Sequence, residues 1–234
     1  MQIIPLENLA IILIPAAAVV AILWCWTGNA KVSIYAISRM IGQLCLIGFL
    51  LTYIFETKHA VLVFLVLMVM LLTSSWIALR SVIEQRVNLY IKALIATFTV
   101  NVTLLFLITQ LVLESEPWFN PRIVIPIAGM TFAVGMNAIS LFIERYHSEL
   151  TQNPTQQTQA RNTAYNATLI PTINSLLAVG LVSLPGMMTG QILSGISPLI
   201  AVRYQIMIML MLFASSGLTS ALFYQLINKQ YKPH

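Results

Sequence analysis

Long apolar runs separated by short polar stretches fill most of this sequence. Most runs hold about 20 residues, the length of helix that crosses the hydrocarbon core of a bilayer. The pattern therefore predicts an all-α polytopic membrane protein, with seven transmembrane helices in one domain over residues 1–234. The expected spans are residues 9–26, 34–54, 60–79, 91–113, 123–143, 169–193 and 199–227.

The last two expected spans contain residues that interrupt helices. Proline lacks the backbone donor that a helix needs, and glycine lowers helix stability, so the helices between residues 169 and 227 must bend or break. The clearest break is expected at Ser194–Pro198, where Ser197 can cap a helix and Pro198 can begin one. The final run is longer than an upright span requires, which predicts a tilted helix or an interfacial first turn.

Composition supports a lipid environment. Apolar residues make up 59% of the chain and charged residues 8%, whereas a soluble domain holds roughly 25% charged residues. The net charge of +5 does not indicate nucleic-acid binding, because the twelve Lys and Arg residues are scattered between apolar runs and form no basic stripe.

The distribution of Lys and Arg predicts an orientation. With seven spans, nine of these residues fall on one side of the membrane and three on the other. Cytosolic loops are the ones enriched in Lys and Arg. This places the C-terminus in the cytosol and the N-terminus outside.

The longest polar stretch, residues 144–168, falls on the cytosolic side. It is rich in Gln, Thr and Asn, a composition typical of a flexible linker, but also of a docking element for a soluble partner. Residues 80–92 form the only other sizeable cytosolic connection in this reading.

Several enzyme classes are excluded by missing motifs. No Lys precedes Ser or Thr, so a Walker A phosphate loop is absent, and all seven acidic residues are glutamate, so the usual magnesium-holding aspartate is absent too. We expect the chain to be no enzyme and to bind no cofactor itself. An ion-gradient-driven carrier commonly has a carboxylate near the membrane midplane. Because Glu56, Glu114 and Glu144 lie at span ends, that class is disfavoured but stays an alternative, as does a structural or regulatory membrane protein.

Polar side chains inside the spans are candidates for interhelical contacts or for a solute path, since both uses shield them from lipid. Those in the spans broken by glycine and proline are the better path candidates, because broken helices free backbone carbonyls that must line a cavity or be buried. The path candidates are Asn137, Asn174 and Gln191, and the candidates for interhelical contacts are Gln43, Asn101 and Gln110.

Residues 183–190 read Ser-Leu-Pro-Gly-Met-Met-Thr-Gly. Gly186 and Gly190 form a small-xxx-small pair that lets a helix approach closely, which is typical of a packing face. The alternative is a gate in which Pro185 breaks the helix and the flexible Met187 and Met188 line a passage.

Glu114 and Glu116 lie in an outward connection before Pro117. They form either a plain solvated loop or a site that attracts cations, since hard cations favour carboxylate oxygens. The sequence identifies no set of metal ligands.

Four motifs carry a resemblance to a known family. The segments Val124–Met130, Leu169–Asn174, Gly180–Gly190 and Tyr204–Ile206 resemble FetB-type iron-export permeases. These are bacterial ABC transporter membrane subunits, and plant aluminium-sensitivity proteins are related to them. The resemblance is strong over residues 123–223 and weaker before them.

The resemblance implies a permease of the bacterial inner membrane that pairs with a separate ATP-binding subunit, two of each, and exports iron or another metal by alternating access. ATP would be used by the partner. The family's cytosolic coupling segment corresponds here to Glu149–Pro154, and Glu149, Pro154 and Arg161 are the expected coupling residues. Pro154 fits the family pattern, whereas the family's glycine is missing and the loop before it is shorter.

Overall fold

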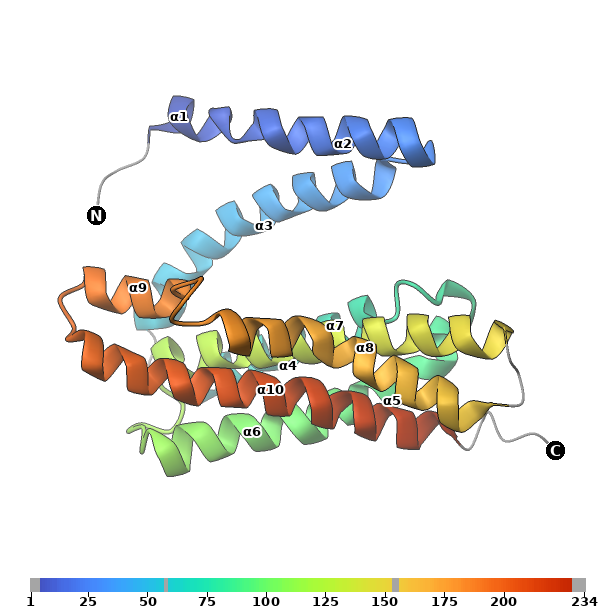
Figure 1. Ribbon diagram of the computed structural model, residues 1–234. Helices are drawn as coiled ribbons and strands as arrows, with labels where there is room; N and C mark the ends of the chain where they lie inside the picture. The colour runs from blue at the N-terminus through green and yellow to red at the C-terminus, as the bar shows by residue number, and fades with distance from the viewer. Residues whose placement is uncertain (1–4, 57–58, 153–155, 229–234) are drawn as a thin grey trace. The chain divides into compact units, whose positions relative to one another are not determined.

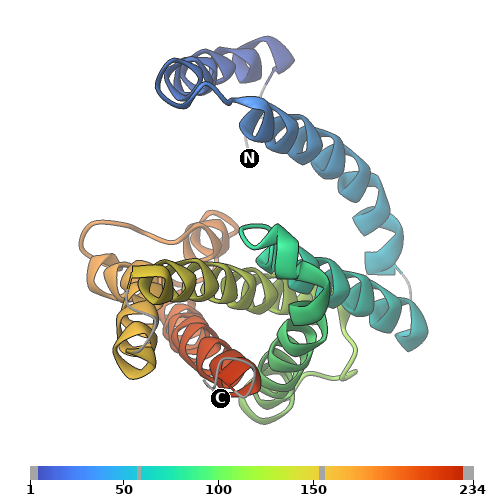
Figure 2. The same cartoon turned by 90° about the vertical axis from the view of Figure 1, so that its right-hand side faces the viewer.

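The computed structural model describes residues 5–56, 59–152 and 156–228, and these residues form helices and no β-strand. The predicted all-α class is therefore confirmed for the described residues. The chain divides into two compact units, Met1–Lys58 and His59–His234. Each unit is described separately below (Figures 1 and 2).

The first unit holds α1 (Leu6–Ile11), α2 (Leu13–Thr27) and α3 (Lys31–Glu56). Together α1 and α2 make one apolar helical run, and none of the α2 residues is buried. Helix α2 ends at Gly28, whose φ of 67° is left-handed and whose N–H donates to the carbonyl of Trp24 at 2.9 Å. Glycine adopts this conformation without a steric penalty, so it is a natural end to the helix.

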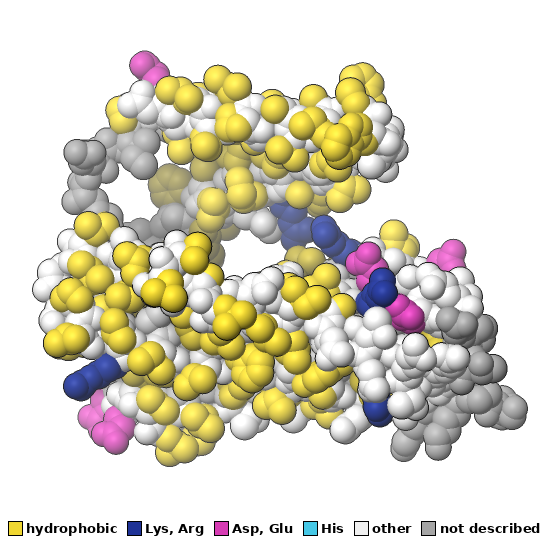
Figure 3. All heavy atoms as spheres, in the orientation of Figure 1, with side chains coloured by type: hydrophobic (Ala, Val, Ile, Leu, Met, Phe, Trp, Pro, Cys, Tyr) yellow, Lys and Arg dark blue, Asp and Glu magenta, His cyan; other side chains and the backbone are white. Residues whose placement is uncertain are grey.

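The second unit is a bundle of longer helices. Its elements are α4 (Ala60–Ala78), the 3₁₀ turn η1 (Ile83–Gln85), α5 (Arg86–Thr97), the π-helical η2 (Phe98–Val102), α6 (Thr103–Phe106), the π-helical η3 (Leu107–Val112), α7 (Pro121–Gln152), α8 (Gln157–Ala178), α9 (Gly186–Leu193) and α10 (Pro198–Asn228). Helix α7 packs against α4, α8 and α10. In Figure 3, apolar side chains cover the middle of this bundle and charged ones gather towards its ends, as expected of helices that cross a membrane.

Six helical runs in the described residues are long and apolar enough to cross a membrane: Glu7–Thr27, Lys31–Phe55, Ala60–Ala78, Ile83–Val112, Pro121–Gln152 and Pro198–Asn228. The expected seventh, residues 169–193, is divided between α8 and α9 by a break at residues 179–185. Because no single helix there is both long and apolar, the count of seven is not confirmed. The predicted helix start at Pro198 is confirmed.

Most of the described residues in the polar stretch 144–168 are helical, which corrects its interpretation as a loop. Helix α7 continues to Gln152 and α8 begins at Gln157. The polar composition had suggested irregular backbone, but α7 and α8 each continue beyond their apolar part. Both extensions keep a buried face, with Tyr146 on α7 and Ala160 and Ala164 on α8. The connection at 80–92 is likewise mostly helical, in η1 and α5.

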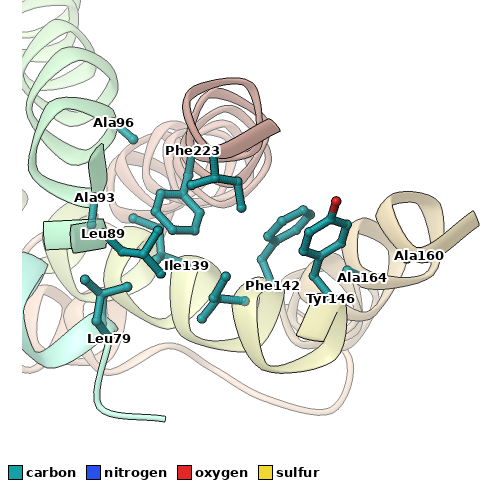
Figure 4. Packing of buried hydrophobic residues seen from close by; sticks show 13 residues of the cluster. Leu79, Leu89, Ala93, Ala96, Ile139, Phe142, Tyr146, Ala160, Ala164 and Phe223 are labelled. Atoms are coloured by element: carbon teal, nitrogen blue, oxygen red, sulfur yellow. The ribbon is translucent and has the colours of Figure 1, made fainter. Parts of the chain in front are cut away.

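A buried aromatic cluster fixes this end of the bundle (Figure 4). Phe142 and Tyr146, one turn apart on α7, stack with ring centroids 5.6 Å apart. Phe142 also makes edge contacts with Phe223 at 6.5 Å and Tyr224 at 5.9 Å, both on α10. Around them, small alanines on α5 and α8 let the helices approach closely.

Replacing Phe142 by alanine should destabilise the protein. In water-soluble cores this change costs about 3–5 kcal/mol. Here lipid replaces water around the unfolded chain, so mainly the packing loss remains, and we expect a cost on the order of 2 kcal/mol. The free energy of unfolding in mixed micelles would measure it, with Phe64→Ala as control, because Phe64 is 57% exposed on α4. Equal stability of the two variants would contradict the central role of the cluster.

Candidate functional site

A cavity of about 570 Å³ lies among α7, α8, α10 and the segment between α8 and α9. Its wall is mainly apolar, with Val134 and Leu141 from α7 and Met209 and Leu212 from α10. Its polar groups come from Asn137, Thr168, Thr172, Asn174, Ser175, Ser183 and Ser216. Pockets of this size and mainly apolar lining, with a few polar groups, are typical of sites for small solutes.

Two amides are the groups in this cavity best able to bind a solute. Asn137 and Asn174 are both exposed, and neither has a hydrogen-bond partner among the described residues. By contrast, the hydroxyls of Thr168 and Ser175 donate to carbonyls of their own helix, Ala164 at 2.8 Å and Pro171 at 2.9 Å. Each free amide offers one oxygen acceptor and two donors. The cavity thus presents hydrogen-bonding groups on two facing helices.

The break after α8 completes the cavity wall. Pro171 lies inside α8 and removes one helical hydrogen bond. The helix ends at Ala178, whose carbonyl accepts N–H groups of Leu181, Val182 and Ser183, and Gly180 has a φ of 84°. This compact turn returns Ser183 and Pro185 to the cavity.

The predicted path residues are brought together only in part. Asn137, Asn174 and Pro185 line the cavity, from α7, α8 and the turn. Gly186, Met187, Met188, Gly190 and Gln191 lie in α9, outside its lining. A methyl group on Gly186 or Gly190 would meet nothing within 4 Å, so within this chain they form no close helix contact. Gln191 is half-buried, and its buried Oε1 has no partner among the described residues.

Residues missed by sequence reasoning are mostly small hydroxyls. Thr172, Ser183 and Ser216 line the cavity. Serine and threonine are common in membrane helices, where they bond to their own backbone, so their presence in the spans carried no signal. Ser216 becomes visible as a wall residue only because α10 packs against both α7 and α8.

Asn101 belongs to another part of the bundle. It is 0% exposed in η2 and contacts Ser215 and Thr219 of α10. Its interpretation as an interhelical contact is confirmed. Gln110 is half-buried in η3 and donates to Thr109 at 3.2 Å.

The predicted coupling residues lie near the aromatic end of the bundle. Glu149 accepts from Arg145 at 2.6 Å within α7. The Arg161 guanidinium lies 5.7 Å from the centroid of the Tyr224 ring, and it donates to Asn162 at 2.9 Å. Arg161 therefore joins the start of α8 to α10. Pro154 lies outside the described residues.

Glu114 and Glu116 are exposed in the segment between η3 and α7. Glu114 has a φ of 45°. Their placement fits a solvated loop as well as a cation-attracting one, so their role stays a prediction. Among the described residues no group of three or more His, Cys, Asp or Glu side chains is positioned to hold a metal ion.

Comparison with known proteins identifies relatives over nearly the whole chain. A UPF0014 membrane protein of Synechocystis is 33% identical, covering 92% of this chain and 88% of its own length. The "Probable iron export permease protein FetB" of Escherichia coli is 34% identical, covering 80% and 76%. The Arabidopsis "Protein ALUMINUM SENSITIVE 3" is 30% identical, covering 88% and 82%. No solved structure matches.

The similarity to FetB-type permeases that the motifs around Pro185 indicate thus covers residues in both units of the chain. Residues 6–231 match a family described as "Uncharacterised protein family (UPF0014)". The chain is a member of the UPF0014 family of membrane proteins, together with the FetB-type permease and the plant aluminium-sensitivity protein.

Proposed function

We propose that this chain is the membrane-spanning permease subunit of an ABC transporter that exports iron or another metal. The supporting observation is the cavity among α7, α8 and α10, whose mainly apolar wall carries the unpaired amides of Asn137 and Asn174. Membership of a family that includes a FetB-type permease supports the substrate class. The chain lacks the phosphate-binding motifs of an ATPase, so a separate subunit supplies ATP hydrolysis.

The cavity chemistry is compatible with a metal substrate. Amide and hydroxyl oxygens are among the ligands that hard cations accept, and the lining supplies both at Asn174 and Ser183. Such groups also bind an oxygen-rich complex of the metal. On the outer side, Glu114 and Glu116 would attract the cation at the end of its path.

A second copy of the chain would close the open side of the cavity. Asn137 and Asn174 are exposed in the single chain, and amides facing lipid are unfavourable. Two permeases side by side in the inner membrane would shield these amides and share one path between them.

The helices connect the cytosolic end of the bundle to the cavity. Glu149 lies on the extension of α7, and Arg161 lies near the start of α8, which continues unbroken to Ala178. A push from the ATP-binding subunits on this end would move α8, the turn before Pro185 and α9 together. That motion would change the side of the membrane to which the cavity opens, as alternating access requires.

ATPase activity of the purified chain with a stand-alone ATP-binding subunit, reconstituted in lipid nanodiscs, tests the proposal. We expect a stable complex whose ATP hydrolysis rises when ferrous or ferric iron is added. Assembly without any response to iron would refute iron as the substrate. Failure to assemble with any ATP-binding subunit encoded beside the chain would refute the ABC transporter assignment.

A further inference from the structure

The cavity among α7, α8 and α10 has a neutral lining. Among the residues that the structure describes, every side chain that lines the cavity is uncharged. The nearest charged residues along the three lining helices are Glu144 on α7, Arg161 on α8 and Arg203 on α10, and all three lie outside the lining. A charged solute would therefore have to bring groups of opposite charge with it.

A bare iron ion would be held poorly by such a lining. Protein sites for multiply charged cations commonly use carboxylates, and the charge of the ligand set is one of the factors that tune their affinity. Burial of a charge without an opposite charge beside it is strongly unfavourable. The amides of Asn137 and Asn174 and the hydroxyl of Ser183 are neutral groups. The single carboxylate of Glu144, outside the lining, cannot balance two or three positive charges.

The volume of the cavity also exceeds what a hydrated ion needs. The cavity holds about 570 Å³, whereas six waters around an ion take up about 180 Å³ at the volume that water has in the liquid. Pockets of about 300–1,000 Å³ are typical for organic molecules of drug size. A metal enclosed by small organic ligands therefore matches the cavity better in size than the hydrated ion does.

The two kinds of surface in the lining fit such a complex. The apolar part can bury the hydrocarbon of the ligands, since contact with apolar side chains removes that hydrocarbon from water. It includes Val134, Leu141, Met209 and Leu212. The amides of Asn137 and Asn174, on different helices, can each donate to an oxygen at the outer edge of a ligand.

We propose that the cavity binds iron as an uncharged complex, in which small organic molecules with anionic oxygen donors cancel the charge of the metal. The inference rests on the proposed function, which supplies the metal, and it narrows the substrate class. The protein recognises the outer surface of the ligands, with Asn137 and Asn174 as hydrogen-bond donors, and forms no bond to the metal itself.

Equilibrium binding of radioactive iron to the full chain in nanodiscs, without any partner subunit, tests this inference. Three complexes of similar size differ in charge: the neutral ferric complex with three maltolates, the anionic ferric complex with three catecholates, and the cationic ferrous complex with three bipyridines. Binding to empty nanodiscs is subtracted. Because the lining is neutral, we expect the maltolate complex to reach half-saturation at a concentration at least tenfold lower than either charged complex or ferrous iron added alone.

Competition with gallium separates recognition of the ligands from recognition of the metal. The gallium complex with three maltolates has the same charge and a similar shape, so it should displace the iron complex with nearly equal affinity. Clearly weaker competition by gallium would show that the protein bonds to the iron, and would contradict the proposed mode of recognition.

Asn174→Asp reverses the charge preference if the inference is correct. The substitution keeps the size of the side chain and adds a negative charge to the lining, so it should weaken binding of the neutral complex and strengthen binding of the cationic one. Asn166→Asp is the matched control, because Asn166 is exposed on the same helix outside the lining. This control should keep all three half-saturation concentrations at the parental values.

Tighter binding of a charged complex, or of ferrous iron alone, would overturn the inference, as would a charge preference that Asn174→Asp does not change. These measurements need no ATP hydrolysis. A chain that responds to iron in the ATPase assay but does not prefer the neutral complex would refute this inference and leave the transport proposal standing. A chain that binds the neutral complex but assembles with no ATP-binding subunit would refute only the ABC transporter assignment.

Discussion

Replacing both cavity amides, Asn137→Leu and Asn174→Leu, should raise the iron concentration that gives half-maximal stimulation of ATP hydrolysis about a hundredfold, while the complex still assembles. Each amide can give one hydrogen bond worth about 1.4 kcal/mol to a bound solute, which is a factor of about ten in binding. The two side chains come from different helices, so their contributions should be nearly additive. Leucine keeps a similar size, which limits the disturbance to helix packing.

The stimulated rate of the complex in nanodiscs, measured over a titration with ferrous iron, checks this expectation. Asn166→Leu is the matched control, because Asn166 is exposed on the same helix as Asn174 but lies outside the cavity lining. If the double variant kept the parental response to iron, the cavity could not be the solute path.

Shuffling residues 150–159 should abolish copurification with the ATP-binding subunit. This segment joins the extended ends of α7 and α8, and in the proposed topology it lies on the cytosolic side. The shuffle keeps the composition and leaves Glu149 in place, so its ion pair with Arg145 is preserved. Specific docking depends on the order of side chains, and a shuffled order removes complementary contacts without changing net charge.

Affinity purification through a tag on the ATP-binding subunit would report the loss. A shuffle of residues 113–116, at the opposite end of the bundle, should leave copurification intact. Should the 150–159 shuffle bind normally, the docking site would have to lie elsewhere, with the η1 turn and the start of α5 as the next region to test.

Much of the architecture follows from hydropathy. A helix in lipid satisfies all its backbone hydrogen bonds internally, so an apolar run of sufficient length has few alternatives to a spanning helix. Five of the expected spans accordingly correspond to apolar helical runs through residue 143, and Pro198 begins α10 as predicted. The polar segment 144–168 was expected to be a loop, whereas most of its described residues are helical. Hydropathy indicates which part of a helix contacts lipid, and it does not indicate where the helix ends.

The candidate site was predictable only in part, for a related reason. Asn137 and Asn174 were recognisable as costly amides within spans, and both line the cavity, although the expected breaks are absent because α7 and α8 each continue past them. Met187 and Met188 belong to the same motif as Pro185, yet they lie in α9, outside the cavity lining, because α9 begins only after the turn at residues 179–185. A sequence motif indicates family membership, whereas the position of each of its residues relative to the cavity depends on where the helix ends.

The sequence by itself determined the lipid environment, the all-α class and the family of this protein. Each of these depends on composition or on the order of residues within a single segment. The tertiary structure alone decided which polar residues meet. Asn101 and Ser215 are 114 positions apart and bond in the bundle interior. Their contact depends on the packing of α10 against η2 and α7, and this packing depends on side-chain shape and on Gly135, which permits the close approach. Such long-range complementarity leaves no periodic trace in the sequence.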